Sequence, residues 1–99
     1  MQWNAIHNGK NLPTKNGQYL ITIKTIDGDE VSRFTTTADF HRRISLFSTD
    51  DENDYSWTWS DDCGETMWSY CIHKWEYDGT VYVEEITAWA EMPEPYVDE

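Results

Sequence analysis

The sequence predicts a mainly β (or small α+β) fold: a single domain of antiparallel hairpins over residues 1–99, with room for one short helix. Runs of β-branched and aromatic residues, which favour strands, recur along the chain. Turn-forming Asp-Gly pairs separate some of these runs. No helical periodicity is sustained. The length of 99 residues is that of one ordinary domain.

The first predicted hairpin follows a turn at Pro13–Gly17. Residues 18–26 (QYLITIKTI) form its first strand and residues 31–36 the returning strand. Asp27–Glu30 connects them, because Asp and Gly tolerate the positive φ that a tight turn requires. Residues 38–47 fit two patterns: alternating apolar residues favour a strand, whereas Phe40, Ile44 and Phe47 also share one helix face. We interpret this segment as a strand.

Residues 48–66 are predicted to be an acidic loop region. Residues 48–54 (STDDEND) contain no apolar side chain, and residues 61–65 form a second acidic turn. Between them, Tyr55, Trp57 and Trp59 alternate with Ser and Thr, which predicts a short strand.

The second predicted hairpin joins residues 67–77 to residues 80–90 through Asp78-Gly79. Pro93 and Pro95 end its second strand, since proline cannot donate to a ladder, and residues 96–99 are a tail. A two-residue turn fixes the register. It predicts four facing pairs: Trp75–Tyr82, His73–Glu84, Cys71–Ile86 and Trp68–Trp89.

Charge is distributed unevenly along the chain. Residues 1–47 hold six basic and four acidic groups, a net of +2, whereas residues 48–99 hold one and fifteen, a net of −14. Such a negative half steers cationic partners and disfavours direct nucleic-acid binding, which needs Lys and Arg. We therefore expect a basic protein as the partner.

The acidic residues have a plain interpretation as a solvated loop. In a second and more specific interpretation, these acidic residues form one negative surface together with Glu76, Asp78, Glu84 and Glu85. Trp57 and Trp59, on one side between two acidic turns, are then an exposed platform for a partner. The residues expected to bind the partner are Asp50, Asp51, Glu52, Asp54, Trp57, Trp59, Asp61, Asp62 and Glu65. The tryptophans expected in the core are Trp3, Trp68, Trp75 and Trp89.

Enzymatic and metal sites are not predicted. No nucleophile elbow, zinc-protease, phosphate-loop or dinucleotide motif is present, and His73 opposite Glu84 is typical of a cross-strand ion pair. Cys63 and Cys71 are expected as free thiols, because their spacing to His73 matches no compact zinc pattern. No cofactor is expected. A calcium site at 50–54, which lacks the Gly and terminal Glu of an EF-hand, and a sugar site on aromatic rings remain alternatives.

Targeting features favour the cytoplasm. No run of about 18 apolar residues exists, so no membrane span is expected. The first residues lack the basic segment and apolar stretch of a signal peptide.

Both ends of the chain carry family-like motifs: Trp3, Leu12-Pro13, Gly17 and Tyr19-Leu20-Ile21, then Val31 and Phe40, and the ending ITAWAEMPEPY at 86–96. In these motifs the chain resembles the phage and prophage family catalogued as domain of unknown function 551. It departs at Ala88, where the family often has His, and at Ala90-Glu91, where it has Met-Pro. Residues 48–80 have no clear counterpart.

The resemblance implies a phage-borne accessory protein with a compact β-rich fold, and it brings no catalytic residue. Together with the acidic half, it leads to a specific hypothesis. The protein is a non-enzymatic phage or prophage protein of the host bacterial cytoplasm that binds a basic, nucleic-acid-handling host protein, as a nucleic-acid mimic or an inhibitor of host defence. A structural phage component is the remaining alternative.

Overall fold

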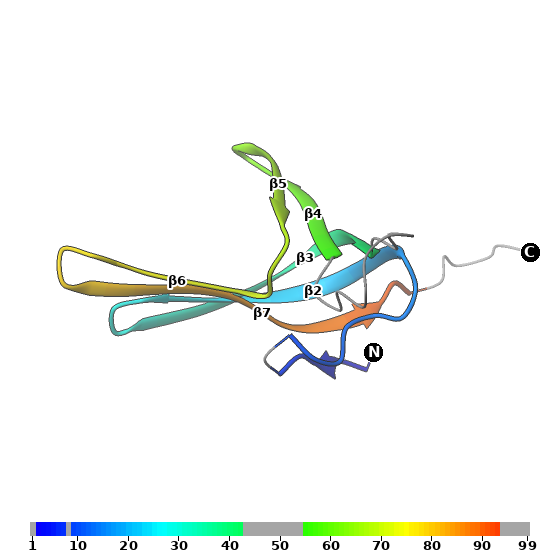
Figure 1. Cartoon of the computed structure of the whole chain (residues 1–99), viewed down its shortest axis with the longest axis horizontal. Helices are drawn as coiled ribbons and strands as arrows, with labels where there is room; N and C mark the ends of the chain where they lie inside the picture. The colour runs from blue at the N-terminus through cyan, green and yellow to red at the C-terminus, as the bar shows by residue number, and fades with distance from the viewer. Residues whose placement is uncertain (1, 8, 43–54, 94–99) are drawn as a thin grey trace, which may run out of the picture.

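Figure 1 shows the computed structural model of the chain, in which residues 2–7, 9–42 and 55–93 are described. The mainly β prediction is confirmed: these residues form antiparallel strands and no helix, hence none that could cross a bilayer. The strands are β1 (Asn4–Ala5), β2 (Gly17–Asp27), β3 (Glu30–Arg42), β4 (Tyr55–Asp61), β5 (Gly64–Trp68), β6 (Ile72–Tyr77) and β7 (Thr80–Glu91).

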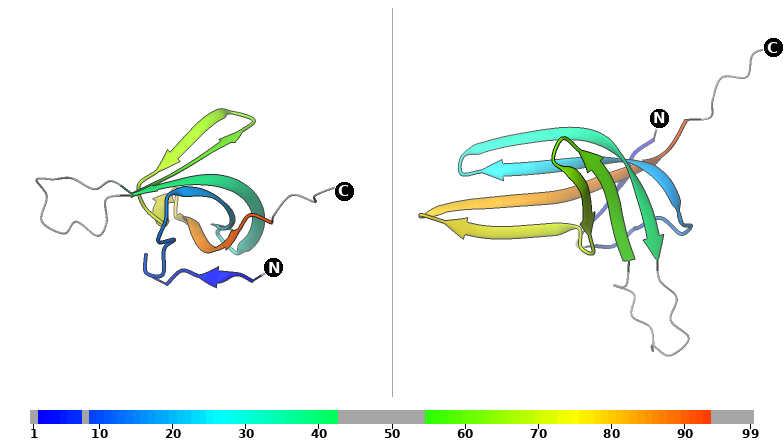
Figure 2. Two further views of the ribbon diagram at one scale, coloured as in Figure 1. Left: turned by 90° about the vertical axis from the view of Figure 1, so that its right-hand side faces the viewer. Right: turned by 90° about the horizontal axis from the view of Figure 1, so that it is seen from above.

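All seven strands belong to one sheet, in the order β1-β7-β2-β3-β4-β5, with β6 also paired to β7. β7 pairs with β2 along one edge, while β6 and β1 share its other edge. The hairpins β2–β3 and β6–β7 therefore extend side by side in the same direction (Figure 1). The β4–β5 hairpin rises from one side of them and crosses them steeply when seen from above (Figure 2).

The first predicted hairpin is confirmed and is longer than expected. Its turn is Gly28-Asp29, and Asp27 faces Glu30. Gly28 has a φ of 62°, which matches the first central position of a type II′ turn, where glycine is favoured. β3 continues to Arg42, so the strand predicted for 38–47 is confirmed as far as residue 42. The remaining residues of that prediction, 43–47, lie outside the described residues.

The second predicted turn is also confirmed. Asp78 and Gly79 have φ values of 51° and 79°, and two positive angles are typical of a type I′ hairpin turn. The pairs Trp75–Tyr82 and His73–Glu84 have the predicted register.

The ladder of this hairpin ends earlier than predicted. The amide of Ile86 still donates to the carbonyl of Cys71 at 2.7 Å. The predicted pair Trp68–Trp89 is wrong, and so is the single strand predicted for 67–77. Trp68 faces Trp57 instead, because strand β5 ends at Trp68 and pairs with β4, and β6 begins as a separate strand at Ile72. The strand predicted around 55–59 and the turn at 61–65 are confirmed as this β4–β5 hairpin.

The core lies on one face of the sheet, called here the inner face, which carries Ile21, Ile23 and Phe40. Side chains alternate between faces along a strand, so the register assigns every other residue to this face. Rings supply much of the buried volume. The centroids of Phe40 and Trp57 lie 4.7 Å apart, and those of Trp59 and Trp68 lie 4.9 Å apart. The opposite side of the sheet is called the outer face.

The four tryptophans predicted to lie in the core differ in how far they are buried. Trp68 is buried, with 6 % of its surface exposed, and Trp75 and Trp89 are half-buried. The prediction is wrong for Trp3, which is 40 % exposed. Trp3 lies just before the two-residue strand β1, outside the alternating runs that build the inner face.

Replacing the most enclosed ring tests this description of the core. Trp57→Ala is expected to lower the free energy of unfolding by about 3–5 kcal/mol, because it removes a fully buried ring between two strands. Trp3→Ala is the matched control and should cost less than about 1 kcal/mol, as expected for a residue outside the core. Urea unfolding followed by circular dichroism measures both. Equal losses would contradict the assignment.

Candidate functional site

The structure describes five of the nine side chains predicted to bind a partner. Asp50, Asp51, Glu52 and Asp54 lie outside the described residues. Asp61, Asp62 and Glu65 are exposed at and beside the β4–β5 turn. This turn therefore carries the part of the predicted acidic region that can be placed.

The predicted platform of Trp57 and Trp59 is wrong. The two rings do share one side of β4, as the two-residue period indicated, but that side is the inner face. Trp57 faces Phe40 on one neighbouring strand and Trp68 on the other, and it is fully buried. Trp59 is 8 % exposed. Trp57 cannot contact a partner.

The predicted negative surface is divided between the two faces. Glu84 shares the inner face with Ile23, whereas its neighbour Glu85 lies opposite Lys24 on the outer face. Glu76 is also on the outer face, opposite Val81. A single surface containing these carboxylates is therefore contradicted, because adjacent residues of a strand point in opposite directions.

What the structure does bring together is a cleft between the β4–β5 hairpin and the inner face of the long hairpins. Within the described residues, β3 and β4 pair between Asp39–Arg42 and Tyr55–Thr58, and the two strands separate toward the tip of the β4–β5 hairpin. The resulting cavity measures 260 Å³. We call it the aromatic-acidic cleft; its lining residues are Ile23, Thr25, Phe34, Trp59, Asp61, Thr66, Trp68 and Glu84.

Asp61 is held in a fixed orientation at the rim of this cleft. Its Oδ1 accepts a hydrogen bond from the amide of Cys63 at 2.8 Å, and its Oδ2 accepts one from Thr66 Oγ1 at 3.2 Å. An acidic side chain that stabilises its own turn is already ordered, so binding a ligand costs little of its conformational entropy.

Glu84 is the second carboxylate of the cleft. It is half-buried and lies between Thr25 of β2 and His73 of β6. Burial raises the pKa of the Tyr70 phenol, and the negative charge of Glu84 raises it further. None of the residues that line the cleft is Lys or Arg. The cleft is therefore a site of negative potential.

A row of rings continues from the cleft along β6 and β7. It consists of Trp59, Trp68, Tyr70, His73, Trp75 and Tyr82, with centroids 4.8–5.5 Å apart from one ring to the next. Aromatic pairs at such distances stabilise sheets beyond their burial. These ring contacts stabilise the part of the sheet beside the cleft.

Rings and carboxylates in one cavity favour a cation. The face of an aromatic ring carries negative charge density and attracts ammonium and guanidinium groups. Carboxylates accept charge-assisted hydrogen bonds from the same groups. Trp59 and Asp61 were predicted as site residues, and Glu84 was predicted as part of the negative surface. Phe34 and Trp68 were missed, because only the tertiary fold brings them to the same cavity.

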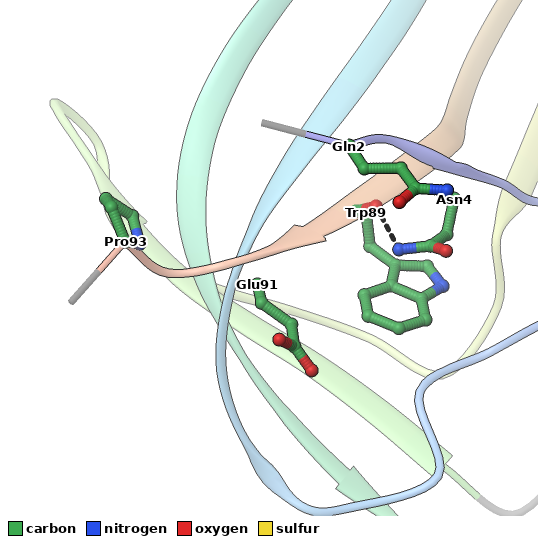
Figure 3. Close-up of a pocket in the computed structure, with 5 residues that line it drawn as sticks. All are labelled: Gln2, Asn4, Trp89, Glu91 and Pro93. Atoms are coloured by element: carbon green, nitrogen blue, oxygen red, sulfur yellow. Dashed lines mark hydrogen bonds between the residues drawn. The ribbon is translucent and has the colours of Figure 1, made fainter.

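A second cavity, of 630 Å³, lies near the ends of the described chain and is lined by Gln2, Asn4, Trp89, Glu91 and Pro93 (Figure 3). Asn4 Nδ2 donates to the carbonyl of Trp89 at 3.3 Å. The indole itself is fixed, because Trp89 Nε1 donates to the carbonyl of Asn11 at 2.7 Å. The cavity thus combines a ring with two amides and a carboxylate.

Metal ligands are not grouped within the described residues: no three His, Cys, Asp or Glu side chains are placed to hold an ion. Both cysteines are free thiols, with Cys63 exposed and Cys71 buried. The calcium alternative at 50–54 lies outside the described residues.

Cys71 forms a buried pair with Tyr55, whose hydroxyl lies 3.2 Å from the thiol sulfur. Burial raises the pKa of both groups above their ordinary values of 9.0 and 10.0. Their hydrogen bond adds to the rise for Tyr55 and offsets part of the rise for Cys71. Both groups therefore remain protonated in the folded protein at pH values where they ionise in the unfolded chain.

This pair predicts a loss of stability in alkali. The stability associated with raised pKa values is fully present below pH 9 and is lost as the pH rises, by up to about 1.4 kcal/mol per pH unit for each group. Cys71→Ala and Tyr55→Phe should each make the fall between pH 8 and 11 shallower. Tyr77→Phe, at a ring that is 72 % exposed, is the control and should fall like the unmodified protein. Urea unfolding at several pH values measures this, and identical slopes would refute it.

No protein-family model, curated protein or solved structure was found to match this chain. The resemblance to domain of unknown function 551 therefore stays a prediction.

Proposed function

We propose that this protein is a non-enzymatic binding protein whose aromatic-acidic cleft receives Lys or Arg side chains of a basic partner. The observation that carries this proposal is the lining of the cleft. Two carboxylates, Asp61 and Glu84, and the rings of Phe34, Trp59 and Trp68 line one cavity with no Lys or Arg among its lining residues.

The strength of such a contact follows from its two components. A cation against an aromatic face gains about 0.5–1 kcal/mol at an exposed site and about 2 kcal/mol when it is desolvated. A hydrogen bond to a charged group contributes about 1.5–3 kcal/mol. One side chain therefore gives a weak site, and a useful affinity needs a partner with several basic residues.

The overall charge supports the same class of partner. A formal net charge of −12 attracts basic proteins over long distances and accelerates their association. Such attraction is screened by salt.

A more specific proposal is that the partner is a nucleic-acid-handling protein of the host of a phage or prophage. The family resemblance at the two chain ends and the acidic composition support it. The cleft suits the Lys and Arg side chains with which such proteins contact phosphates. The single negative surface expected from the sequence is not part of this proposal, because Glu84 and Glu85 lie on opposite faces.

The cleft is tested by removing one charge at a time. Asp61→Asn and Glu84→Gln should each weaken binding of a fluorescent oligo-arginine peptide about tenfold, the equivalent of one charge-assisted hydrogen bond. Asn at position 61 can still accept from the Cys63 amide, so the turn is retained. Fluorescence anisotropy at low and physiological salt measures the affinity.

The controls remove the same charge elsewhere. The control variants are Glu65→Gln and Glu76→Gln. Glu65 lies on the same hairpin as Asp61 but on the outer face, and Glu76 lies on the outer face of β6. Both should change affinity less than about twofold, through long-range charge alone. If all four variants weaken binding equally, or if binding does not depend on salt, a specific cation site in the cleft is ruled out.

A carbohydrate ligand is a second candidate, favoured by the cavity beside Trp89. A ring accompanied by the amides of Gln2 and Asn4 and the carboxylate of Glu91 can stack on a sugar and bond its hydroxyl groups. A glycan array separates the two functions. Binding that is lost in Trp89→Phe but kept in Glu84→Gln would assign the sugar to this cavity.

A further inference from the structure

The outer face of the long hairpins carries exposed apolar side chains. Val31, Ile72 and Val81 are 50 %, 53 % and 38 % exposed there. Ile26 lies among them, opposite Val31 on β3 and Val83 on β7. A sheet that is apolar on a face ordinarily buries that face against another layer.

Charges are balanced on this surface, unlike in the chain as a whole. Lys24 lies opposite both Arg33 and Glu85, and Lys74 and Glu76 lie on the same face of β6. Three basic and two acidic side chains thus surround the apolar residues, in a chain with a formal net charge of −12. Two copies can approach here without the repulsion that their overall charge produces elsewhere.

Two of these charges, Lys24 and Glu85, are placed so that they can pair between two copies. Consider a two-fold axis that runs parallel to the strands, between β2 and β7, in the plane between two stacked copies. It places β2 of one copy over β7 of the other. Lys24 then faces Glu85 of the second copy, and Ile26 faces its Val83, each contact occurring twice. Stacked sheets lie about 10 Å apart, a separation that such side chains span.

We propose that the protein forms a homodimer in which these outer faces pack against each other as a two-layer sandwich. Its two-fold axis relates Lys24 of each copy to Glu85 of the other. The aromatic-acidic clefts lie on the inner faces and stay open in this dimer, so the proposal does not depend on the proposed function.

The test uses two charge reversals that should restore each other. Lys24→Glu and Glu85→Lys are each expected to weaken the dimer about a hundredfold, because like charges then face each other across the interface. In an equimolar mixture, position 24 of one variant faces position 85 of the other with opposite charge in both contacts. Sedimentation velocity should then show a species with the mass of two chains, absent from either variant alone.

The mixture isolates the contact between copies. Lys24 and Glu85 are also neighbours within one chain, and that neighbourhood stays like-charged in both variants of the mixture. Recovery can therefore come only from the interface. Glu65→Lys, with the same charge change on the distant strand β5, is the control and should leave the dimer intact.

Circular dichroism confirms that each variant folds. Should a reversal prevent folding, Ile26→Asp carries the same test and should yield single chains, because it places an unpaired charge opposite Val83 of the second copy. A wild-type protein that sediments as a single chain up to millimolar concentration would overturn the proposal. So would a mixture that stays monomeric while the wild type is a dimer.

Discussion

The packing of Trp57 between rings of two neighbouring strands is the interaction on which the rest of the structure depends. Phe40 on β3 and Trp68 on β5 face it directly. This contact anchors the β4–β5 hairpin, which pairs with β3 over four residue pairs in the described part of the chain. Everything that the hairpin positions, including Asp61 and the cleft beneath it, follows from this burial. Aromatic residues make up 15 % of the sequence. Rings therefore supply much of the packing that aliphatic side chains provide in other cores.

The local elements could be predicted from the sequence because their causes are local. The Asp-Gly pairs mark both long hairpins, and alternation marks β4. What alternation cannot tell is which side of a strand becomes the inside. The same period that correctly grouped Trp57 with Trp59 was compatible with an exposed platform and with a core. Partners distant in sequence, above all Phe40 and Trp68, decide that question.

The candidate site shows the same division between local and distant causes. Asp61 could be found because acidic residues cluster around a turn, and that turn also holds it in place. Phe34 and Trp68 could not, since they belong to different hairpins. The break before β6 was missed as well, because no Gly or Pro marks residues 69–71. The alternation that separates Glu84 from Glu85 gives the protein two chemically distinct faces, and a count of charges along the chain does not reveal this.

One irregularity in β7 has a consequence for variation of this fold. Between the pairs Thr22–Ala88 and Ile23–Ile86, Thr87 has no partner on β2, which makes it a β-bulge. This extra residue changes the phase of alternation, so that Ile86 and Trp89 both face inward although they are three positions apart. Deleting Thr87 would place Ala88 directly after Ile86 and restore regular alternation, with Ala88 still opposite Thr22 and Trp89 still facing inward opposite Ile21. A related chain could thus lose the bulge by a single codon deletion and keep Trp89 beside its cavity, while losing the hydrogen bond that the Thr87 carbonyl accepts from the Ile6 amide at 2.8 Å.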